Sequence, residues 1–453
     1  MYFSFNFSFK KSLLQARHSR LFQADLHRNF LRSVYSCILT KTQKNYMKQI
    51  NSYKTNPIRI WNISVIIMIS ILSASCKKES KSTGPSSNTT SIDTNMIVVP
   101  ANNTNIVYMG RIDFTDPKAP LFAYSGVNIQ AKFQGTSIDV IIQDYAVGGS
   151  QHTNYYNILI DSSLYTNLQV NSNDTLYKIA RNLTNTSHTI EIFKKTEAQV
   201  GSSAFKGFRV LANTTLLPAG VQPTRKIEFI GDSYTCGYGD DTSIAAPPAG
   251  NPTTGFSAVY ENNYKAWGAT VCRYFNAQYH CTAFSGRGMY RNNNASTSGT
   301  LPLIYNQTNP NNPSTLWSTA NYIPDLVVIH LGTNDFAPEQ TSSPSMVDSA
   351  TFVSTYVNFI TTLRSYYPST KIICVVPNSE TDYYPVGFKT LTRLTSYINS
   401  VVNACNNNGD SNVFYFALTP QLAPYGQDWH PTAATQLSMA NQIEPFIKST
   451  LGW

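Results

Sequence analysis

The sequence predicts an all-β sandwich of the jelly-roll type followed by an α/β domain with a flavodoxin-like, parallel five-stranded sheet. Residues 96–218 contain short apolar runs with period-two alternation, whereas residues 225–453 alternate strand-like runs with helix-period stretches. At 453 residues the chain is long enough for two domains. The strand–helix alternation is typical of a parallel sheet covered by helices on both faces.

Positive charge is concentrated at the start of the chain. The net charge is +9, and residues 1–76 carry eleven Lys and Arg against the single acid Asp25, which leaves about −1 for the remainder. A nucleic-acid-binding surface requires a basic face, so we expect no nucleic-acid partner. Abundant Tyr, Asn, Ser and Thr suit an extracellular protein that handles neutral polar ligands such as sugars.

Residues 1–76 have the pattern of a leader. From Met47 a basic segment precedes the apolar run 63–72 and a group of small residues that ends at Cys76. This order is that of a secretory signal, and it resembles a bacterial lipoprotein signal, although Leu72 stands one place further from the cysteine than usual. The resemblance implies lipidation of Cys76 in the cell envelope; an ordinary secretory signal or an uncleaved anchor are the alternatives. We expect translation to start at Met47.

A polar segment follows the predicted leader. Residues 77–95 lack apolar content, so we expect a flexible linker.

The seven cysteines form no CxxC pair, and Cys272 and Cys281 could be either a disulfide or two buried thiols. There is no HExxH motif and the histidines are scattered, so we expect no metal and no cofactor.

The β-sandwich prediction covers residues 96–218. Its strand-like runs are 106–109, 127–133, 137–142, 157–160, 188–193 and 207–211. The dense polar groups of this unit are His188 and Lys194-Lys195-Thr196-Glu197, which we expect on an edge or outer face. An accessory domain that helps to shape the catalytic cleft is the alternative.

The α/β domain prediction covers residues 225–453. The expected strands are 226–230, 279–284, 326–331, 371–376 and 413–418, and the expected helices are 262–275, 346–366, 389–406 and 433–450. In such sheets the active site lies beyond the carboxyl ends of the strands. The segments that follow strands, or lie near the carboxyl terminus, are Gly231-Asp232-Ser233, Ser285-Gly286-Arg287-Gly288, Gly332-Thr333-Asn334-Asp335 and Asp428-Trp429-His430-Pro431.

These four segments supply the groups that acyl transfer requires. A serine hydroxyl needs a base to take its proton, and the tetrahedral oxyanion needs fixed hydrogen-bond donors. A second Gly-Asp-Ser at Gly409-Asp410-Ser411 precedes a strand, and we interpret it as a turn. We interpret His330, which lies inside an apolar strand, as a core residue, and Asp335 as a residue that caps a helix or holds the loop.

In order and rough spacing, the segments resemble the conserved blocks of the SGNH (GDSL-like) hydrolases from about Arg225 to the carboxyl terminus. The preceding unit resembles the jelly-roll domain of carbohydrate esterase family 2 through Gly110-Arg111, residues 133–137 and Lys195-Thr196-Glu197-Ala198. This resemblance implies removal of acetyl groups from plant polysaccharides such as xylan or glucomannan.

The resemblance also implies roles for individual residues. Ser233 is the nucleophile and His430 the general base, and the backbone N–H groups of Ser233 and Gly286 form the oxyanion hole with the Asn334 side chain; Gly288 competes with Gly286 for this role. The wider SGNH superfamily places its acid three residues before the histidine, a position held here by Gln427, whereas Asp428 lies two before, so either the Asp428 carboxylate or a backbone carbonyl orients His430. Trp429 is a candidate wall for the acyl pocket or a sugar ring.

We therefore expect a secreted, lipid-anchored carbohydrate O-acetyl esterase whose partner is an acetylated polysaccharide or oligosaccharide. Contact with a membrane is expected only through the lipid anchor. One alternative is a general short-chain esterase or lipase of the SGNH class. An alternative from another class is a non-catalytic, carbohydrate-binding surface lipoprotein.

Overall fold

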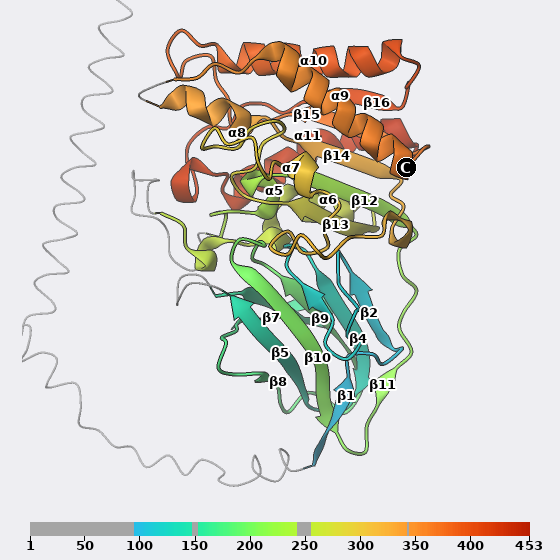
Figure 1. Cartoon of the computed structure of the whole chain (residues 1–453). Helices are drawn as coiled ribbons and strands as arrows, with labels where there is room; N and C mark the ends of the chain where they lie inside the picture. Colours follow the sequence, from blue (N-terminus) through green and yellow to red (C-terminus); the bar gives the residue numbers. More distant parts are fainter. Residues whose placement is uncertain (1–94, 147–152, 242–254, 342–343) are drawn as a thin grey trace, which may run out of the picture. The chain divides into compact units, whose positions relative to one another are not determined.

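The computed structural model describes residues 95–146, 153–241, 255–341 and 344–453, which form a β-sandwich followed by an α/β domain (Figure 1). The predicted leader, the lipidation site Cys76 and all but the last residue of the predicted linker lie outside the described residues. None of the helices in the described ranges combines the length and apolar composition needed to cross a bilayer.

The amino-terminal domain consists of antiparallel strands in two sheets. The strands of one sheet are β1 (Met96–Pro100), β3 (Leu121–Phe122), β5 (Ile138–Ala146), β8 (Leu176–Ala180) and β10 (Gly201–Leu211). Those of the other are β2 (Ile106–Met109), β4 (Asn128–Gln134), β6 (Tyr155–Ile160), β7 (Ser163–Gln169), β9 (Ser187–Lys194) and β11 (Leu216–Leu217). Inward residues of both sheets, such as Ile129, Phe133, Val140 and Phe208, share one core, which confirms the predicted sandwich.

All six runs predicted in this domain are strands. The sequence did not reveal the two-residue strands β3 and β11 or the strands β1, β7 and β8, which are mostly exposed or half-buried. Of these, β7 pairs with β6 as a hairpin. Because β7 buries no side chain, its sequence lacks the apolar alternation on which the prediction depends.

The carboxy-terminal domain is organised around a parallel sheet of five strands. They are β12 (Arg225–Gly231), β13 (Ala277–Ala283), β14 (Leu326–His330), β15 (Lys371–Val376) and β16 (Val413–Ala417). Their spatial order is β13-β12-β14-β15-β16, and every neighbouring pair is parallel. This 2-1-3-4-5 order is the predicted flavodoxin-like topology, which brings the carboxyl ends of all strands to one edge.

Helices cover both faces of this sheet (Figure 1). Residues Val327 and Ile329 of β14 pack with α9 (Ser349–Tyr366) and α10 (Thr390–Asn407). The intervening Val328 packs with α6 (Trp267–Tyr274) and α11 (Ala433–Leu451) on the opposite face. Burial on both faces explains why the central strands β14 and β15 are almost continuously apolar.

The predicted helix from residue 262 begins later, at Trp267. Asn263–Lys265 form the 3₁₀ turn η2, and Ala266 has an extended backbone with φ −62° and ψ 152°. Cys272 of α6 and Cys281 of β13 are free, buried thiols, so the structure contains thiols rather than the disulfide alternative at these two positions.

The polar segment after β9 corrects one prediction. Lys194, Lys195, Thr196 and Glu197 are fully buried, and His188 of the inner strand β9 is 7% exposed, so none of them lies on an edge or outer face. The segment 194–197 contacts the α/β domain: Lys195 pairs with Asp241 at 3.2 Å, among other contacts. The expectation of an outer face was wrong because buried ion pairs and hydrogen bonds compensate these charges, so the polar residues can lie inside the protein.

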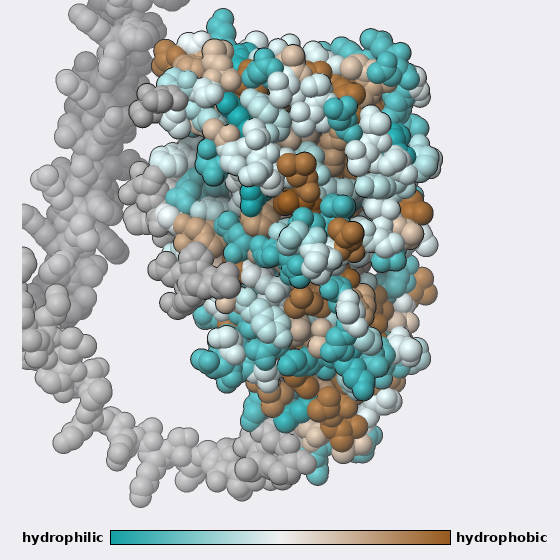
Figure 2. All heavy atoms as spheres, in the orientation of Figure 1, coloured by the Kyte–Doolittle hydropathy of each residue, from teal (hydrophilic) through white to brown (hydrophobic). Residues whose placement is uncertain are grey.

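The surface of the described part is mixed. On the face in Figure 2, hydrophobic residues lie in small groups among hydrophilic ones. Such scattered exposure is normal for a globular protein.

Candidate active site

The nucleophile candidate Ser233 lies at the end of β12, at the first position of the short helix α5 (Ser233–Cys236). Asp232 caps this helix by accepting the N–H of Tyr234 at 3.1 Å. Gly231 is required at the turn, because a Cβ there would lie 2.1 Å from Thr235 Oγ1 and 3.2 Å from the His330 carbonyl oxygen. The sharp turn therefore presents the Ser233 hydroxyl at the carboxyl edge of the sheet.

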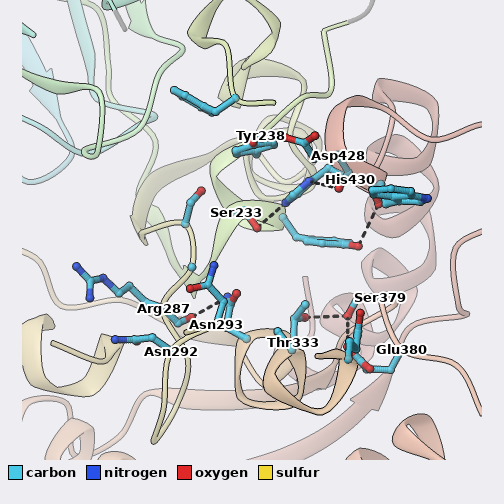
Figure 3. A pocket seen from close by; sticks show the side chains of 18 of the residues that line it. Ser233, Tyr238, Arg287, Asn292, Asn293, Thr333, Ser379, Glu380, Asp428 and His430 are labelled. Carbon is cyan, nitrogen blue, oxygen red and sulfur yellow. Dashed lines mark hydrogen bonds between the residues drawn. The ribbon is translucent and has the colours of Figure 1, made fainter. Parts of the chain in front are cut away.

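His430 lies beside Ser233 although 197 residues separate them in the chain. Figure 3 shows its ring pointing at the serine, and Nε2 lies 2.8 Å from Ser233 Oγ. Nδ1 lies 3.1 Å from the Gln427 carbonyl oxygen and 3.0 Å from the Asp428 carbonyl oxygen. Carbonyl oxygens only accept hydrogen bonds, so the proton resides on Nδ1 and Nε2 is free to accept the Ser233 O–H.

The Asp428 carboxylate does not contact the imidazole. It accepts the Tyr238 O–H at 2.6 Å and the Gly255 N–H at 3.1 Å. Asp428 has a left-handed backbone with φ 48°, and Trp429 follows with φ 59°. Of the two alternatives left open by the sequence, the structure therefore places a backbone carbonyl, not the acid, against His430, because this turn directs the carbonyl inward and the carboxylate to Tyr238.

Tyr238 is a site residue that the sequence did not single out. Its ring stacks on His430 with centroids 4.1 Å apart and an interplanar angle of 28°. The Asp428 carboxylate fixes the Tyr238 hydroxyl, and thereby the ring that covers the imidazole (Figure 3). Tyr238 follows the nucleophile segment in the sequence Gly237-Tyr238-Gly239. Its distance along the chain from His430 gave no indication that the two residues are in contact.

Backbone donors lie near Ser233. Within the described part of the chain, the N–H groups of Ser233 and Gly286 have no hydrogen-bond partner, whereas the Gly288 N–H donates to Asn292 Oδ1 at 3.3 Å. Gly286 has φ +77° and lines the cleft. Of the two glycines, Gly286 is thus the one whose N–H is available to an oxyanion.

The third expected donor, Asn334, lies in α8 (Thr333–Phe336) after β14. Its Nδ2 contacts the Arg287 carbonyl oxygen at 3.0 Å and the Asp232 carboxylate at 3.2 Å. These contacts hold the side chain in the cleft wall. To donate to an oxyanion, the Asn334 amide group must give up one of these two hydrogen bonds. The longer one, to Asp232, is the weaker.

Burial alters the pKa of the titratable groups near the serine. It lowers the pKa of His430 to about 4, so the imidazole is neutral at pH 7 and able to act as a base. The same cause raises the pKa of Asp232 to about 7 and lowers that of His330 to about 4. His330 is fully buried beside Tyr234, with its Nδ1 3.9 Å from Asp232, and is the expected core residue.

The cleft in front of Ser233 has a volume of about 1040 Å³. Side-chain amides and aromatic rings dominate its lining, and the half-exposed Trp429 forms part of it. Further lining residues include Asn292, Asn293, Gln340, Tyr384, Gln421 and Tyr425. Neutral hydrogen-bonding groups beside aromatic faces suit a ligand with many hydroxyl groups.

One group in the described ranges has the chemistry of metal ligands. Glu197, Cys236 and Glu261 have ligand atoms within 4.8 Å of one another. Glu197 already accepts hydrogen bonds from Ser285, and the buried Lys194 ammonium compensates both carboxylates. We therefore assign these residues to the protein's internal polar network.

Comparisons with known proteins agree with this architecture. Residues 108–219 match the family model "Carbohydrate esterase 2 N-terminal", and residues 229–436 match the GDSL-like Lipase/Acylhydrolase family. The chain is 35% identical to cellulase/esterase CelE of Acetivibrio thermocellus over 78% of its own length, but spans only 40% of that protein. It is 27% identical to an acetylxylan esterase / glucomannan deacetylase of Cellvibrio japonicus, over 81% of this chain and 94% of the relative.

Two solved structures cover the two domains together. A family two carbohydrate esterase from Clostridium thermocellum in complex with cellohexaose is 34% identical, with a TM-score of 0.69 over 77% of this chain and 99% of that one. A family two carbohydrate esterase from Cellvibrio japonicus is 25% identical, with a TM-score of 0.69 over 79% and 98% of the two chains. The chain therefore belongs to carbohydrate esterase family 2.

Proposed function

We propose that this chain is a serine esterase that removes O-acetyl groups from polysaccharides such as xylan or glucomannan. The observation that carries the proposal is the contact of 2.8 Å between Ser233 Oγ and His430 Nε2 within a polar, aromatic cleft. The names of the relatives support the acetyl group and the polysaccharide. The cleft volume of about 1040 Å³ supports a large alcohol portion, because an acetyl group alone fills a small part of it.

The first half of the reaction forms an acetyl-enzyme. Ser233 Oγ attacks the acetyl carbonyl carbon as His430 Nε2 takes the hydroxyl proton. The negative oxygen of the tetrahedral intermediate accepts the N–H groups of Ser233 and Gly286, with Asn334 as a third donor. The bond to the sugar oxygen then breaks, and the Nε2 proton passes to that oxygen, so the sugar leaves as an alcohol.

The second half regenerates the enzyme. Water gives a proton to His430 Nε2 and adds to the acetyl carbon, and collapse of the intermediate returns the proton to Ser233 and releases acetate. The Gln427 and Asp428 carbonyl oxygens keep Nδ1 protonated in both halves. Asp428 acts as a positioning residue through Tyr238, and Trp429 supplies an aromatic surface for a sugar ring.

The test is acetate release from acetylated xylan and acetylated glucomannan by the wild-type protein and its Ser233→Ala variant. We expect the variant to lose at least about 10⁴-fold in kcat with an unchanged fold. Ser411→Ala, in the second Gly-Asp-Ser, is the matched control because Ser411 is exposed on a turn before β16. It should retain full activity.

Three other results would contradict the proposal. Turnover by Ser233→Ala would remove the nucleophile assignment. Faster hydrolysis of long-chain acyl esters would instead favour the general esterase or lipase alternative. Binding of the polysaccharide without release of acetate from any ester would favour the carbohydrate-binding alternative.

We further propose that the protein is exported and anchored in the cell envelope by lipid on Cys76. The support is the order of basic segment, apolar run and small residues before that cysteine. Metabolic labelling with a fatty-acid analogue should mark the wild-type protein and not Cys76→Ser. Labelling of both proteins would exclude Cys76 as the site.

A further inference from the structure

Glu197 is a fully buried carboxylate of the β-sandwich domain that the proposed reaction does not use directly. It lies in the connection between β9 and β10. Both of its oxygens contact one residue of the α/β domain: Oε2 accepts the Ser285 N–H at 2.8 Å, and Oε1 accepts the Ser285 hydroxyl. Ser285 immediately precedes Gly286, so this carboxylate holds the loop that carries a proposed oxyanion donor.

The same carboxylate also contacts the helix of the nucleophile. Glu197 Oε2 lies 3.6 Å from Cys236 Sγ, at the end of the helix that begins with Ser233. One side chain from the sandwich thus joins the two segments whose N–H groups are proposed to bind the oxyanion.

The contact with Ser285 fixes the direction of the Gly286 N–H. That N–H belongs to the peptide bond between residues 285 and 286, whose orientation depends on the ψ of Ser285 and the φ of Gly286. Glu197 holds Ser285 at its nitrogen and its hydroxyl, and the Asn293 N–H donates to the Gly286 carbonyl oxygen at 3.0 Å. The peptide is therefore restrained on both sides.

Glu197 is itself held in place. Its N–H donates to Glu261 Oε2 at 3.1 Å, and Lys194 Nζ donates to its carbonyl oxygen at 3.4 Å and to that of Thr196 at 2.6 Å. All four of these side chains are fully buried. A donor that is fixed before the reaction stabilises an oxyanion without reorganisation, and a rigid neighbour is what such a donor needs.

We propose that Glu197 is a positioning residue for the oxyanion hole, supplied by the sandwich domain, that aligns the Gly286 N–H by holding Ser285 from behind. This inference depends on the proposed esterase function, because it concerns the same oxyanion hole. It assigns a share of the catalytic geometry to the domain expected to be accessory.

The test compares Glu197→Gln with the wild-type protein on 4-nitrophenyl acetate, a substrate without a sugar. Glutamine has one accepting oxygen and no charge, so at most one of the two hydrogen bonds that Ser285 donates to the carboxylate remains, and that bond is weakened. Removal of an oxyanion donor costs about 10²–10³-fold in kcat; for a misaligned donor we expect a loss of about 10–10²-fold, with KM changed less than about threefold. Glu191→Gln, on the preceding strand β9, is the matched control because Glu191 bonds Asn128 and not the loop.

A second variant keeps the inference testable if Glu197→Gln does not fold. Ser285→Ala removes the hydroxyl contact and keeps the N–H contact, so we expect a smaller loss in kcat, of about threefold to tenfold. Because both substitutions disturb one interaction, the double variant should lose no more than Glu197→Gln alone.

The outcomes separate this inference from the proposed function. If the wild-type protein does not hydrolyse the acetyl ester, the proposed function fails. If wild type is active, Ser233→Ala is inactive, and Glu197→Gln is less stable in urea but has wild-type kcat per folded molecule, Glu197 is structural only and the inference fails. Additive losses in the double variant would also overturn it.

Discussion

At the residue scale, the main feature is that backbone carbonyls contact Nδ1 of His430, the proposed general base, where a catalytic triad has an acid. His430 Nδ1 contacts the carbonyl oxygens of Gln427 and Asp428 at 3.1 and 3.0 Å, while the Asp428 carboxylate binds Tyr238. The carboxylate thus acts on the imidazole through the stacked tyrosine ring and through its charge, which raises the pKa of His430 against the larger effect of burial. Loss of its charge should disturb His430 far less than loss of a directly bonded acid.

The first prediction concerns Asp428→Asn. Asparagine keeps an oxygen that can accept the Tyr238 O–H, and the carbonyl contacts of His430 are unchanged, so we expect kcat to fall by less than about tenfold. Removal of the charge from a direct triad acid lowers kcat about 10⁴-fold. The measurement is kcat on acetylated xylan, with His430→Ala as the reference for full loss. A loss equal to that of His430→Ala would restore the acid role to the carboxylate.

The second prediction concerns pH. Burial lowers the pKa of His430 to about 4, and the base must be neutral to take the serine proton. As pH falls through this value the imidazole gains a proton, so kcat/KM should stay constant from pH 7 to about 5 and decline with an apparent pKa near 4. A profile of kcat/KM from pH 3 to 8 on a neutral acetyl ester measures this. A decline centred near the ordinary value of 6.5 would contradict it.

The sequence predicted the residues of this site better than their contacts. Ser233, Gly286, Asn334 and His430 meet at one edge of the sheet because they follow or lie beyond the ends of parallel strands, which period and order reveal. The orientation of the Asp428 side chain depends on a left-handed φ at a non-glycine residue, and no sequence pattern predicts such a conformation.

At the scale of elements, the loop that carries Gly286 is held by a second buried carboxylate, Asp335, in addition to Glu197. Asp335 accepts the N–H groups of Met289, Tyr290 and Arg291 at 2.8, 2.8 and 3.1 Å. This is the loop-holding role that the sequence allowed. Since the three donors are consecutive, the carboxylate fixes a whole turn of the chain, and it does so from the helix of Asn334.

The third prediction is that Asp335→Asn weakens this loop. The amide group of asparagine would face the Met289 N–H, leaving a buried donor without an acceptor, so we expect the free energy of unfolding to fall by about 2–3 kcal/mol. We also expect kcat to fall, because Gly286 belongs to the same loop. Urea unfolding and kcat are the measurements, with the exposed Asp116→Asn as control. An unchanged free energy of unfolding would show that the turn at residues 289–291 is stable without the Asp335 carboxylate.

Elements were predicted unevenly. The central strands and long helices were within a few residues of their observed bounds because burial gives them strong periodicity. The short strands β3 and β11, the mostly exposed or half-buried strands β1, β7 and β8, and the turn before α6 were not predicted, since short length, solvent exposure and 3₁₀ geometry leave no such pattern.

At the scale of the whole described structure, buried polar contacts join the two domains. Arg111, before β3, lies 2.9 Å from Glu228 of β12, and both side chains are about 1% exposed. Glu228 also accepts the hydroxyl groups of Thr282 and Tyr305. Sequence reasoning found Arg111 only as part of a family motif, because a pair 117 residues apart has no periodic signature.

The fourth prediction is that the domains unfold as one cooperative unit that depends on this pair. Arg111→Met leaves the Glu228 charge buried without its partner, so we expect a loss of about 3–5 kcal/mol in the free energy of unfolding. The exposed Lys118→Met should change it by less than about 0.5 kcal/mol.

The sequence offers a direct measurement of that cooperativity. No tryptophan lies within residues 96–218, and once Trp61 of the predicted leader is replaced by Phe, the remaining Trp267, Trp317, Trp429 and Trp453 all lie in the α/β domain. Tryptophan fluorescence therefore follows the α/β domain, and hydrogen exchange of peptides from 96–218 follows the sandwich. Coincident transitions are expected; two separate transitions would show that the interface does not couple the domains.

The left-handed turn at Asp428 and Trp429 determines which substitutions the group that orients His430 can tolerate. The group that orients the imidazole is encoded in the path of the main chain, so its chemistry does not depend on which side chain occupies the position. A carbonyl dipole also has no proton to gain, and the orienting group therefore keeps its full strength in acid. Substitutions that preserve the turn can vary the residue type, whereas a proline at position 429, whose φ is fixed near −65°, would remove the orienting group without touching any catalytic side chain.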